Sequence, residues 1–253
     1  MRLTARGRTA YGLLVAVLFT AAVAGWKSAS SGPRPLPATG DGAVVTADRM
    51  STSPSTAAPR RVTRRPAATA VGTPAVPVVG GGRFVAAPGD GPVRGTGRLR
   101  RYRVQVEAGL AESAVAFATQ VERALADPRG WGAGGRLSFQ RVATGPADFT
   151  VVLAAPAMTD QLCRPLDTAG IYSCFQHGRA VINYLRWRTG AAAYNGDLAS
   201  YRQYVVMHEV GHALGNSHVD CPAPSALAPT MMQQTKGVGA CRPNPWPYPE
   251  EED

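Results

Sequence analysis

The sequence predicts an α+β domain in the C-terminal part of the 253-residue chain. Several short segments alternate polar and apolar residues, which is the pattern of half-buried β-strands. Two longer segments place apolar residues three and four positions apart, which is the pattern of amphipathic α-helices. Along the chain the predicted order is strand, helix, four strands and helix, followed by irregular chain.

The first 26 residues have the form of an export signal. Arg2, Arg6 and Arg8 precede an uncharged, mainly apolar run over residues 10–26. Basic residues before such a run are typical of segments whose N-terminal side stays in the cytoplasm. The run is at the short limit of a membrane-spanning helix, so residues 1–26 are predicted to be either a single-pass signal anchor or a cleaved signal peptide. In both cases the rest of the chain is expected to be extracytoplasmic, anchored with its C-terminus outside or secreted.

Residues 27–94 are dominated by Ala, Pro, Thr, Ser, Gly and Arg, and they show no sustained periodicity. Such a composition buries too little apolar surface to offset the entropy lost on folding. We therefore expect a disordered linker, extended by its prolines. The apolar stretch "TAVGTPAVPVV" leaves open a short docked strand. Residues 95–253 then form the folded domain.

The basic charge of the chain lies in its N-terminal part. Residues 1–100 hold 14 Lys and Arg against 3 Asp and Glu, whereas residues 101–253 hold 13 against 14. A nucleic-acid-binding domain needs its basic residues on a folded surface. Nucleic acid is therefore not an expected partner. A solvated linker accounts for the charge, and so does one that lies against an anionic membrane or cell-wall surface.

Within the domain, each element is predicted in chain order. "RYRVQVE" alternates and predicts a strand, and "LAESAVAFATQVERALADP" predicts an amphipathic helix that ends at Pro128. "RLSFQRVA" and "ADFTVVLAA" are the next strands, and "GIYSCFQHG" and "RAVINYLRW" are a further pair joined around Gly178. "DLASYRQYVVMHEVGHALG" is the second long helix, with Asp197 as its N-cap and Gly215 as its C-terminal stop.

The four cysteines, Cys163, Cys174, Cys221 and Cys241, are expected to form disulfides, because an even number in an exported chain indicates them. Four cysteines allow three connectivities. Cys163–Cys174 with Cys221–Cys241 is favoured, since both bonds close short loops. A cysteine-based zinc site is the alternative, but the sequence contains no CxxC pair.

Three of the chain's four histidines lie in "HEVGHALGNSH". His208 and His212 are four residues apart on the predicted helix, so both imidazoles project from one face. Gly215 lets the chain leave the helix and bring His218 to the same ion. Three neutral imidazoles leave the fourth position of tetrahedral Zn²⁺ open, as in a catalytic site. Glu209 has the place of the carboxylate that acts on water in the HExxH pattern.

"HEVGHALGNSH" resembles the zinc signature HExxHxxGxxH of the metzincin metallopeptidases. The resemblance implies a zincin-like catalytic domain with a twisted mixed sheet, one antiparallel edge strand, an active-site helix and a Met-turn. It makes Met231 in "APTMMQQT" the expected Met-turn methionine, with Met232 as the alternate. It also places the antiparallel edge strand in "GIYSCFQHG", where an extended peptide would bind by strand addition.

More narrowly, the N-terminal segment, the Pro-rich linker and the ending "QQTKGVGACRPNPWP" resemble a family of uncharacterised actinobacterial envelope proteins with a metzincin-like domain. The chain departs from well-studied metzincins in three ways. No Tyr follows the methionines, so a tyrosine ligand is not expected there. Val219 and Asp220 after His218 do not settle the subfamily, and no cysteine-switch propeptide is evident.

Together these residues predict an extracytoplasmic zinc metalloendopeptidase with Zn²⁺ as cofactor and Glu209 as general base. The expected partners are a peptide or protein substrate in the cell envelope and the membrane through the N-terminal segment, and the catalytic domain is expected to be monomeric. Two alternatives stay open: a catalytically inactive, zinc-stabilised binding module of the cell envelope, and hydrolysis of a non-protein amide such as a cell-wall crosslink. Glu209 favours an enzyme, because a purely structural zinc site does not need that carboxylate.

Overall fold

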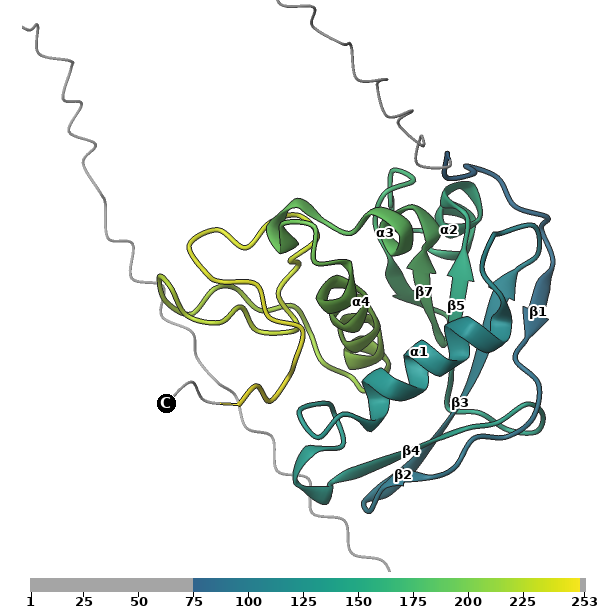
Figure 1. Ribbon diagram of the computed structural model, residues 1–253, viewed down its shortest axis with the longest axis horizontal. Coiled ribbons are helices and arrows are strands. Elements are labelled where there is room, and N and C mark those ends of the chain that lie inside the picture. The colour runs from purple at the N-terminus through teal and green to yellow at the C-terminus, as the bar shows by residue number, and fades with distance from the viewer. Residues whose placement is uncertain (1–74, 251–253) are drawn as a thin grey trace, which may run out of the picture. The chain divides into compact units, whose positions relative to one another are not determined.

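The computed structural model describes residues 75–250 of the chain (Figure 1). The predicted export signal at residues 1–26 and residues 27–74 of the predicted linker lie outside the described residues. Within residues 75–250, none of the helices has the length and apolar character that a membrane span requires.

The described residues form a mixed α/β domain, in which helices pack against a seven-stranded sheet (Figure 1). The strands are β1 (Phe84–Ala86), β2 (Arg94–Gly95), β3 (Arg98–Glu107), β4 (Leu137–Arg141), β5 (Phe149–Ala154), β6 (Cys174–Gln176) and β7 (Arg179–Asn183). The α-helices are α1 (Ala114–Ala126), α2 (Pro156–Leu162), α3 (Tyr184–Thr189) and α4 (Leu198–Ala213). Two short 3₁₀ helices are η1 (Ala133–Gly135) and η2 (Ala192–Tyr194).

The sheet has a parallel centre with antiparallel strands around it. β4, β3, β5 and β7 are parallel neighbours in that order. β2 pairs antiparallel with β4 at one edge, β6 pairs antiparallel with β7 at the other, and β1 pairs antiparallel with β3. β6 is therefore the antiparallel edge strand expected in "GIYSCFQHG". The expectation of only one antiparallel strand is wrong, because β1 and β2 are antiparallel as well.

The domain starts earlier than residue 95, because residues 75–94 belong to the fold rather than to a disordered linker. Besides the pairing of β1 and β2, the backbone N–H of Gly81 donates to the carbonyl of Ala108 over 2.7 Å. The buried carboxylate of Glu107 accepts a further hydrogen bond from the Gly82 N–H over 3.0 Å. A segment that is held by backbone bonds to an existing sheet needs no apolar periodicity of its own. The apolar stretch "TAVGTPAVPVV" was the one sign of it in the sequence, but its residues 75–79 form no strand, and β1 and β2 lie further along the chain.

The remaining predicted elements are present in part. "RYRVQVE", "RLSFQRVA" and "ADFTVVLAA" form β3, β4 and β5, and the two long helices are α1 and α4. "RAVINYLRW" is not one strand, because β7 ends at Asn183 and α3 begins directly after it. The Asn183 side chain accepts a hydrogen bond from the Leu185 N–H, which caps α3. Helix α2, which begins at Pro156, has no counterpart among the predicted elements.

Helix α4 positions the candidate site. The Asp197 side chain caps it as predicted, accepting a hydrogen bond from the Ser200 N–H over 3.0 Å. Every residue of the helix from Tyr204 to Gly211 is buried, and α4 shares one hydrophobic core with α1 and the sheet. A helix that is buried all round can carry polar side chains only where they meet partners or line a cavity.

The four cysteines form the two disulfides that short loops favour. Cys163–Cys174 joins the end of α2 to the start of β6, with the Cα atoms 6.0 Å apart. Cys221–Cys241 joins the chain just after His218 to the C-terminal segment, with the Cα atoms 5.8 Å apart. Disulfides are typical of proteins in oxidising, extracytoplasmic compartments.

Candidate metal centre

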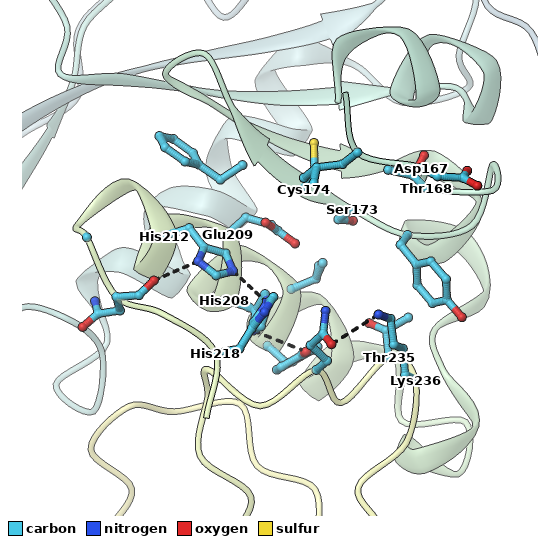
Figure 2. A pocket seen from close by; sticks show the side chains of 18 residues that line it. Asp167, Thr168, Ser173, Cys174, His208, Glu209, His212, His218, Thr235 and Lys236 are labelled. Atoms are coloured by element: carbon cyan, nitrogen blue, oxygen red, sulfur yellow. Dashed lines mark hydrogen bonds between the residues drawn. The ribbon is translucent and has the colours of Figure 1, made fainter. Parts of the chain in front are cut away.

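The three histidines of "HEVGHALGNSH" converge on one point (Figure 2). One ring nitrogen from each of His208, His212 and His218 lies within 4.8 Å of the others, which is close enough for all three to hold one metal ion. The Nε2 atoms of His212 and His218 are 3.0 Å apart. Helix α4 supplies the first two histidines, and the chain that follows it supplies the third.

The backbone after α4 turns back at Gly215, as the sequence predicted. Gly215 has a φ of 95°, a conformation that side chains other than glycine's disfavour. The Asn216 N–H returns to the carbonyl of Gly211 over 3.0 Å, which closes the end of the helix. The Val219 N–H donates to the carbonyl of Met231 over 3.3 Å, which connects the chain after α4 to the segment that contains Met231.

Hydrogen bonds orient two of the imidazole rings. The Nδ1 atom of His208 lies 2.8 Å from the carbonyl oxygen of Thr230, and that of His212 lies 2.9 Å from the carbonyl of Asn216. A carbonyl only accepts, so both Nδ1 atoms carry the proton and both Nε2 atoms keep a free lone pair. Backbone carbonyls often orient histidine ligands in this way.

The rings are also kept neutral, as metal ligation requires. Burial lowers the pKa of His208 to about 3, and burial also lowers the pKa of His212 and of His218. The Nε2 lone pair of His212 faces His218 at a distance over which two nitrogens share either a proton or a cation. The donor set, its tautomers and its spacing therefore fit a divalent metal that prefers imidazole, such as Zn²⁺.

Glu209 lies beside this cluster and lines the same cleft. Its side chain is buried, with 4 % of the residue exposed, and desolvation raises its pKa to about 8. Its Oε2 atom has no hydrogen-bond partner among the described residues. A buried polar atom without a partner is costly, and such atoms in native proteins mark sites for a water, an ion or catalysis.

Met231 packs beneath the helix turn that carries the ligands. A Cβ atom added to Gly211 would run into the Met231 sulfur, and it would come within 2.8 Å of the Trp131 ring. Met231 is buried, whereas Met232 is half-buried and bonds through its carbonyl to the Tyr204 hydroxyl over 2.9 Å. Of the two methionines, Met231 is therefore the one whose side chain packs against α4. Its role in a Met-turn stays a prediction.

Sequence reasoning missed the side chains that hold this segment in place. Tyr204, one turn before His208, accepts a hydrogen bond from the Gln234 N–H over 2.8 Å. The fully buried Gln234 side chain accepts from the Tyr194 hydroxyl and donates to the carbonyl of Asn244. The spacing of four residues between Tyr204 and His208 was a usable signal. Gln234 had no such signal in the sequence, because glutamines are mostly exposed and a buried one is not expected.

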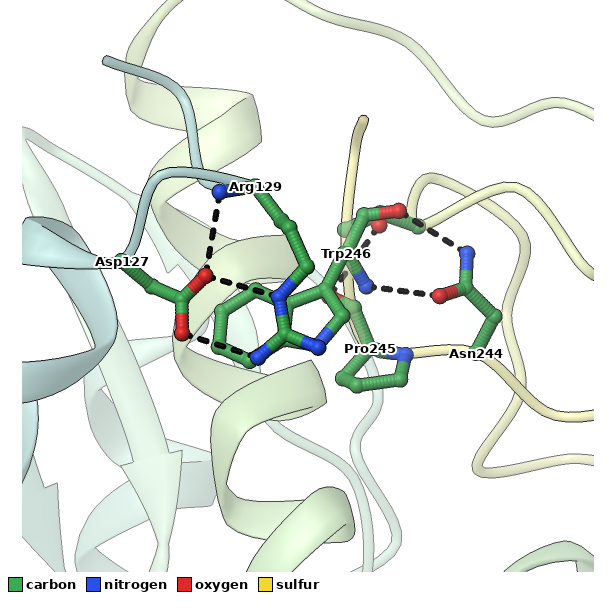
Figure 3. Close-up of polar contacts among 6 residues, drawn as sticks. Asp127, Arg129, Asn244, Pro245 and Trp246 are labelled. Carbon is green, nitrogen blue, oxygen red and sulfur yellow. Dashed lines mark hydrogen bonds and ion pairs between the residues drawn. The ribbon is translucent and has the colours of Figure 1, made fainter. Parts of the chain in front are cut away.

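The C-terminal segment is held against the chain that follows α1 (Figure 3). The Arg129 guanidinium donates two hydrogen bonds of 2.9 Å to Asp127 and lies 4.4 Å from the centre of the Trp246 ring. The Asn244 amide bonds to both the N–H and the carbonyl of Trp246. The segment around Trp246 forms no strand or helix. It is held instead by the stacking of its ring on the ion-paired Arg129 and by the turn centred on Asn244.

The cluster of three histidines opens into a cleft of about 440 Å³ (Figure 2). Its walls come from α4, from the chain before and within β6, and from the chain after Met231. Within the described sheet β6 pairs only with β7, so its other edge is unpaired. The site thus combines three candidate ligands, a buried carboxylate and an open strand edge.

The chain belongs to the family described as "Protein of unknown function (DUF3152)", whose family model matches residues 71–249. The match begins before β1, in agreement with a domain that includes residues 75–94. Neither the comparison with curated proteins nor the one with solved structures gave a match.

Proposed function

We propose that this domain is an extracytoplasmic zinc-dependent metalloendopeptidase. The observation that carries the proposal is the combination, in one open cleft, of three convergent neutral imidazoles and a buried carboxylate without a partner. A site that only stabilises the fold has no use for an open position or an unsatisfied carboxylate. The resemblance of "HEVGHALGNSH" to the metzincin signature supports the same conclusion.

His208, His212 and His218 would hold the ion. Zinc bound in such a site supplies a Lewis acid for the scissile carbonyl and lowers the pKa of a water molecule towards neutrality. The hydrogen bonds from His208 to Thr230 and from His212 to Asn216 would keep the rings in place during turnover. His218 is exposed, so the cluster is open to solvent on its side.

Glu209 would act as general base and then as general acid. It would take a proton from the attacking water and deliver it to the amine of the departing fragment. Burial raises the pKa of this carboxyl to about 8, whereas a cation in the cleft favours the carboxylate. These opposing effects bring its pKa towards neutral pH, where a group can both accept and return a proton.

Strand β6 would bind the substrate. Its free edge runs along the cleft that contains Glu209 and the histidines, and Cys174 and Phe175 of β6 line that cleft. An extended peptide that adds to this edge places its backbone, rather than particular side chains, against the site. This mode of binding suits a protein or peptide substrate in the cell envelope.

The location outside the cytoplasm rests on two observations. Both disulfides flank the cleft, and such bonds persist in oxidising compartments. The basic and then apolar pattern of residues 1–26 is that of an export signal. Whether retained as an anchor or removed, that segment would deliver the domain to the cell envelope.

The test is cleavage of a diverse peptide mixture by the protein made in an oxidising compartment and loaded with zinc. We expect new peptide termini in mass spectra for the wild type, and none after treatment with a chelator. Glu209→Ala is expected to retain zinc but to lose activity by about 10²–10⁴-fold, because the proton acceptor is gone. Glu250→Ala, a change at the exposed C-terminal end, serves as the matched control and should cleave like the wild type.

Equal rates for Glu209→Ala and the wild type would contradict the proposed mechanism. A wild type that is folded and holds zinc, yet cleaves no peptide, would contradict the peptidase itself. That result would favour a binding module or a non-protein amide as substrate, and cell-wall material would be the next substrate to try.

A further inference from the structure

One lysine stands at an end of the cleft. Among the described residues that line the cleft, Lys236 is the only lysine or arginine. Its ammonium group donates a hydrogen bond to the side-chain oxygen of Gln233 over 3.2 Å and lies 5.3 Å from the centre of the Tyr172 ring. None of the ion pairs in the described part of the chain involves Lys236. Its charge is therefore available to a ligand.

The contact between Lys236 and Tyr172 marks which end of the cleft this is. Tyr172 precedes β6 by two residues, so it lies at the N-terminal end of that strand. Lys236 belongs to the opposite wall, formed by the chain after Met231, and Figure 2 shows it across the cleft from Asp167 and Thr168. The lysine thus lies beyond the start of β6, to one side of the histidines.

The direction of β6 decides which part of a bound peptide would meet the lysine. Antiparallel pairing is slightly more stable than parallel pairing, so an added strand is expected to run opposite to β6. Its C-terminal part then lies at the N-terminal end of β6, near Tyr172 and Lys236. In a hydrolysed peptide this is the side of the departing amine.

Among the described residues that line the cleft, Asp167 is the other charged side chain at this end. Its carboxylate accepts a hydrogen bond from the Ala169 N–H over 2.9 Å, within its own turn, and it makes no ion pair with Lys236 in the described structure. It therefore offsets the positive potential of the lysine only from a distance, through partly screened electrostatics.

We propose that Lys236 selects ligands that carry a carboxylate on the C-terminal side of the scissile bond. The carboxylate belongs either to an acidic side chain or to the free C-terminus of a short peptide. The inference rests on the proposed function, because it takes the metal centre as the point where the ligand is held.

Binding of anchored probes tests this selectivity without requiring turnover. Each probe carries a zinc-chelating hydroxamate at its N-terminal end, followed by three residues that extend towards Lys236. Glu, Gln and Lys are placed in turn at each position with an amidated C-terminus, and one further Gln probe ends in a free carboxylate. Affinities for the zinc-loaded protein are measured by calorimetry.

We expect the best Glu probe, or the free-carboxylate probe, to bind about fivefold more tightly than its neutral partner, as for a partly exposed ion pair. Lys236→Gln should abolish this difference, Lys236→Glu should reverse it in favour of Lys, and Asp167→Asn should enlarge it. Arg94→Gln removes the same charge from β2, at the opposite edge of the sheet, and should leave the preference unchanged.

Equal affinities of the acidic and neutral probes would overturn the inference, as would a preference that survives Lys236→Gln. If the zinc-loaded protein binds none of the probes, the inference is overturned, and a metal centre with an open position is contradicted as well. A carboxylate preference in a protein that cleaves no peptide would support the inference while contradicting the peptidase, so the two failures are distinguishable.

Discussion

At the scale of single residues, Glu209 joins two properties that rarely occur together. It is almost completely buried, and its Oε2 atom has no hydrogen-bond partner in the described part of the chain. By contrast, the carboxylate of Glu107 is equally buried but accepts hydrogen bonds from the N–H groups of Gly82 and Ala155. Glu107 thus serves the fold, whereas Glu209 costs the fold stability, which is the usual mark of a functional group.

This cost makes the zinc-free protein sensitive to pH. Burial raises the pKa of Glu209 from its ordinary 4.5 to about 8. The free energy of unfolding therefore decreases as the pH rises above 4.5, and the decrease is complete above pH 8. Glu209→Gln should therefore stabilise the zinc-free protein by about 4 kcal/mol at pH 8 and by progressively less towards pH 4.5. Urea unfolding of both proteins across this range measures the difference. A difference that does not vary with pH would contradict this explanation.

At the scale of elements, helix α4 and the segment around Met231 form one unit. Gly211 allows Met231 and Trp131 to pack directly against the helix between its two candidate ligands. The Trp131 indole N–H also donates to the carbonyl of Met207 over 2.8 Å. The position of the ligands thus depends on side chains far away in sequence.

Gly211→Ala tests this packing. Alanine favours a helix over glycine by about 1 kcal/mol, so this substitution would stabilise the protein at a helix position with space for a methyl group. Here the added methyl group meets Met231 and Trp131, and we expect a net loss of about 1–3 kcal/mol together with weaker zinc binding. Denaturant unfolding and zinc titration measure both effects. In the double variant with Met231→Ala the loss of stability should be smaller than the sum of the losses of the two single variants. A loss equal to that sum would count against direct contact.

At the scale of the whole molecule, the two disulfides hold opposite walls of the cleft. Cys163–Cys174 closes the loop that includes Asp167 and Tyr172. Cys221–Cys241 closes the segment that runs from just after His218 to the C-terminal chain. Both walls consist largely of irregular chain, which crosslinks can stabilise by restricting the unfolded state.

Replacing both cysteines of one pair by serine should therefore have two distinct outcomes. Loss of Cys221–Cys241 is expected to reduce stability by about 2–4 kcal/mol and to weaken zinc binding, because His218 lies three residues before Cys221. Loss of Cys163–Cys174 should also reduce stability but leave zinc affinity nearly unchanged. Thermal unfolding and zinc titration of the two variants provide the comparison. Equal losses of zinc affinity would show that the walls are not independent.

The sequence alone determined the features that depend on local spacing. The interval of four residues between His208 and His212 places both on one helix face, and Gly215 permits the turn that returns His218. Alternation indicated β3, β4 and β5, and short loops indicated the two disulfides. These features follow from periodicity and chain geometry, which neighbouring residues carry.

Only the tertiary structure decided the features that depend on distant partners. Residues 75–94 join the domain through backbone bonds to β3 and β4, which leave no pattern in their own side chains. The buried Gln234 and the packing of Met231 against Gly211 likewise depend on residues far along the chain. The site's candidate ligands were thus predictable from a few adjacent residues. The walls of the cleft could not be predicted in this way, because the conformation of irregular chain depends on the distant residues against which it packs.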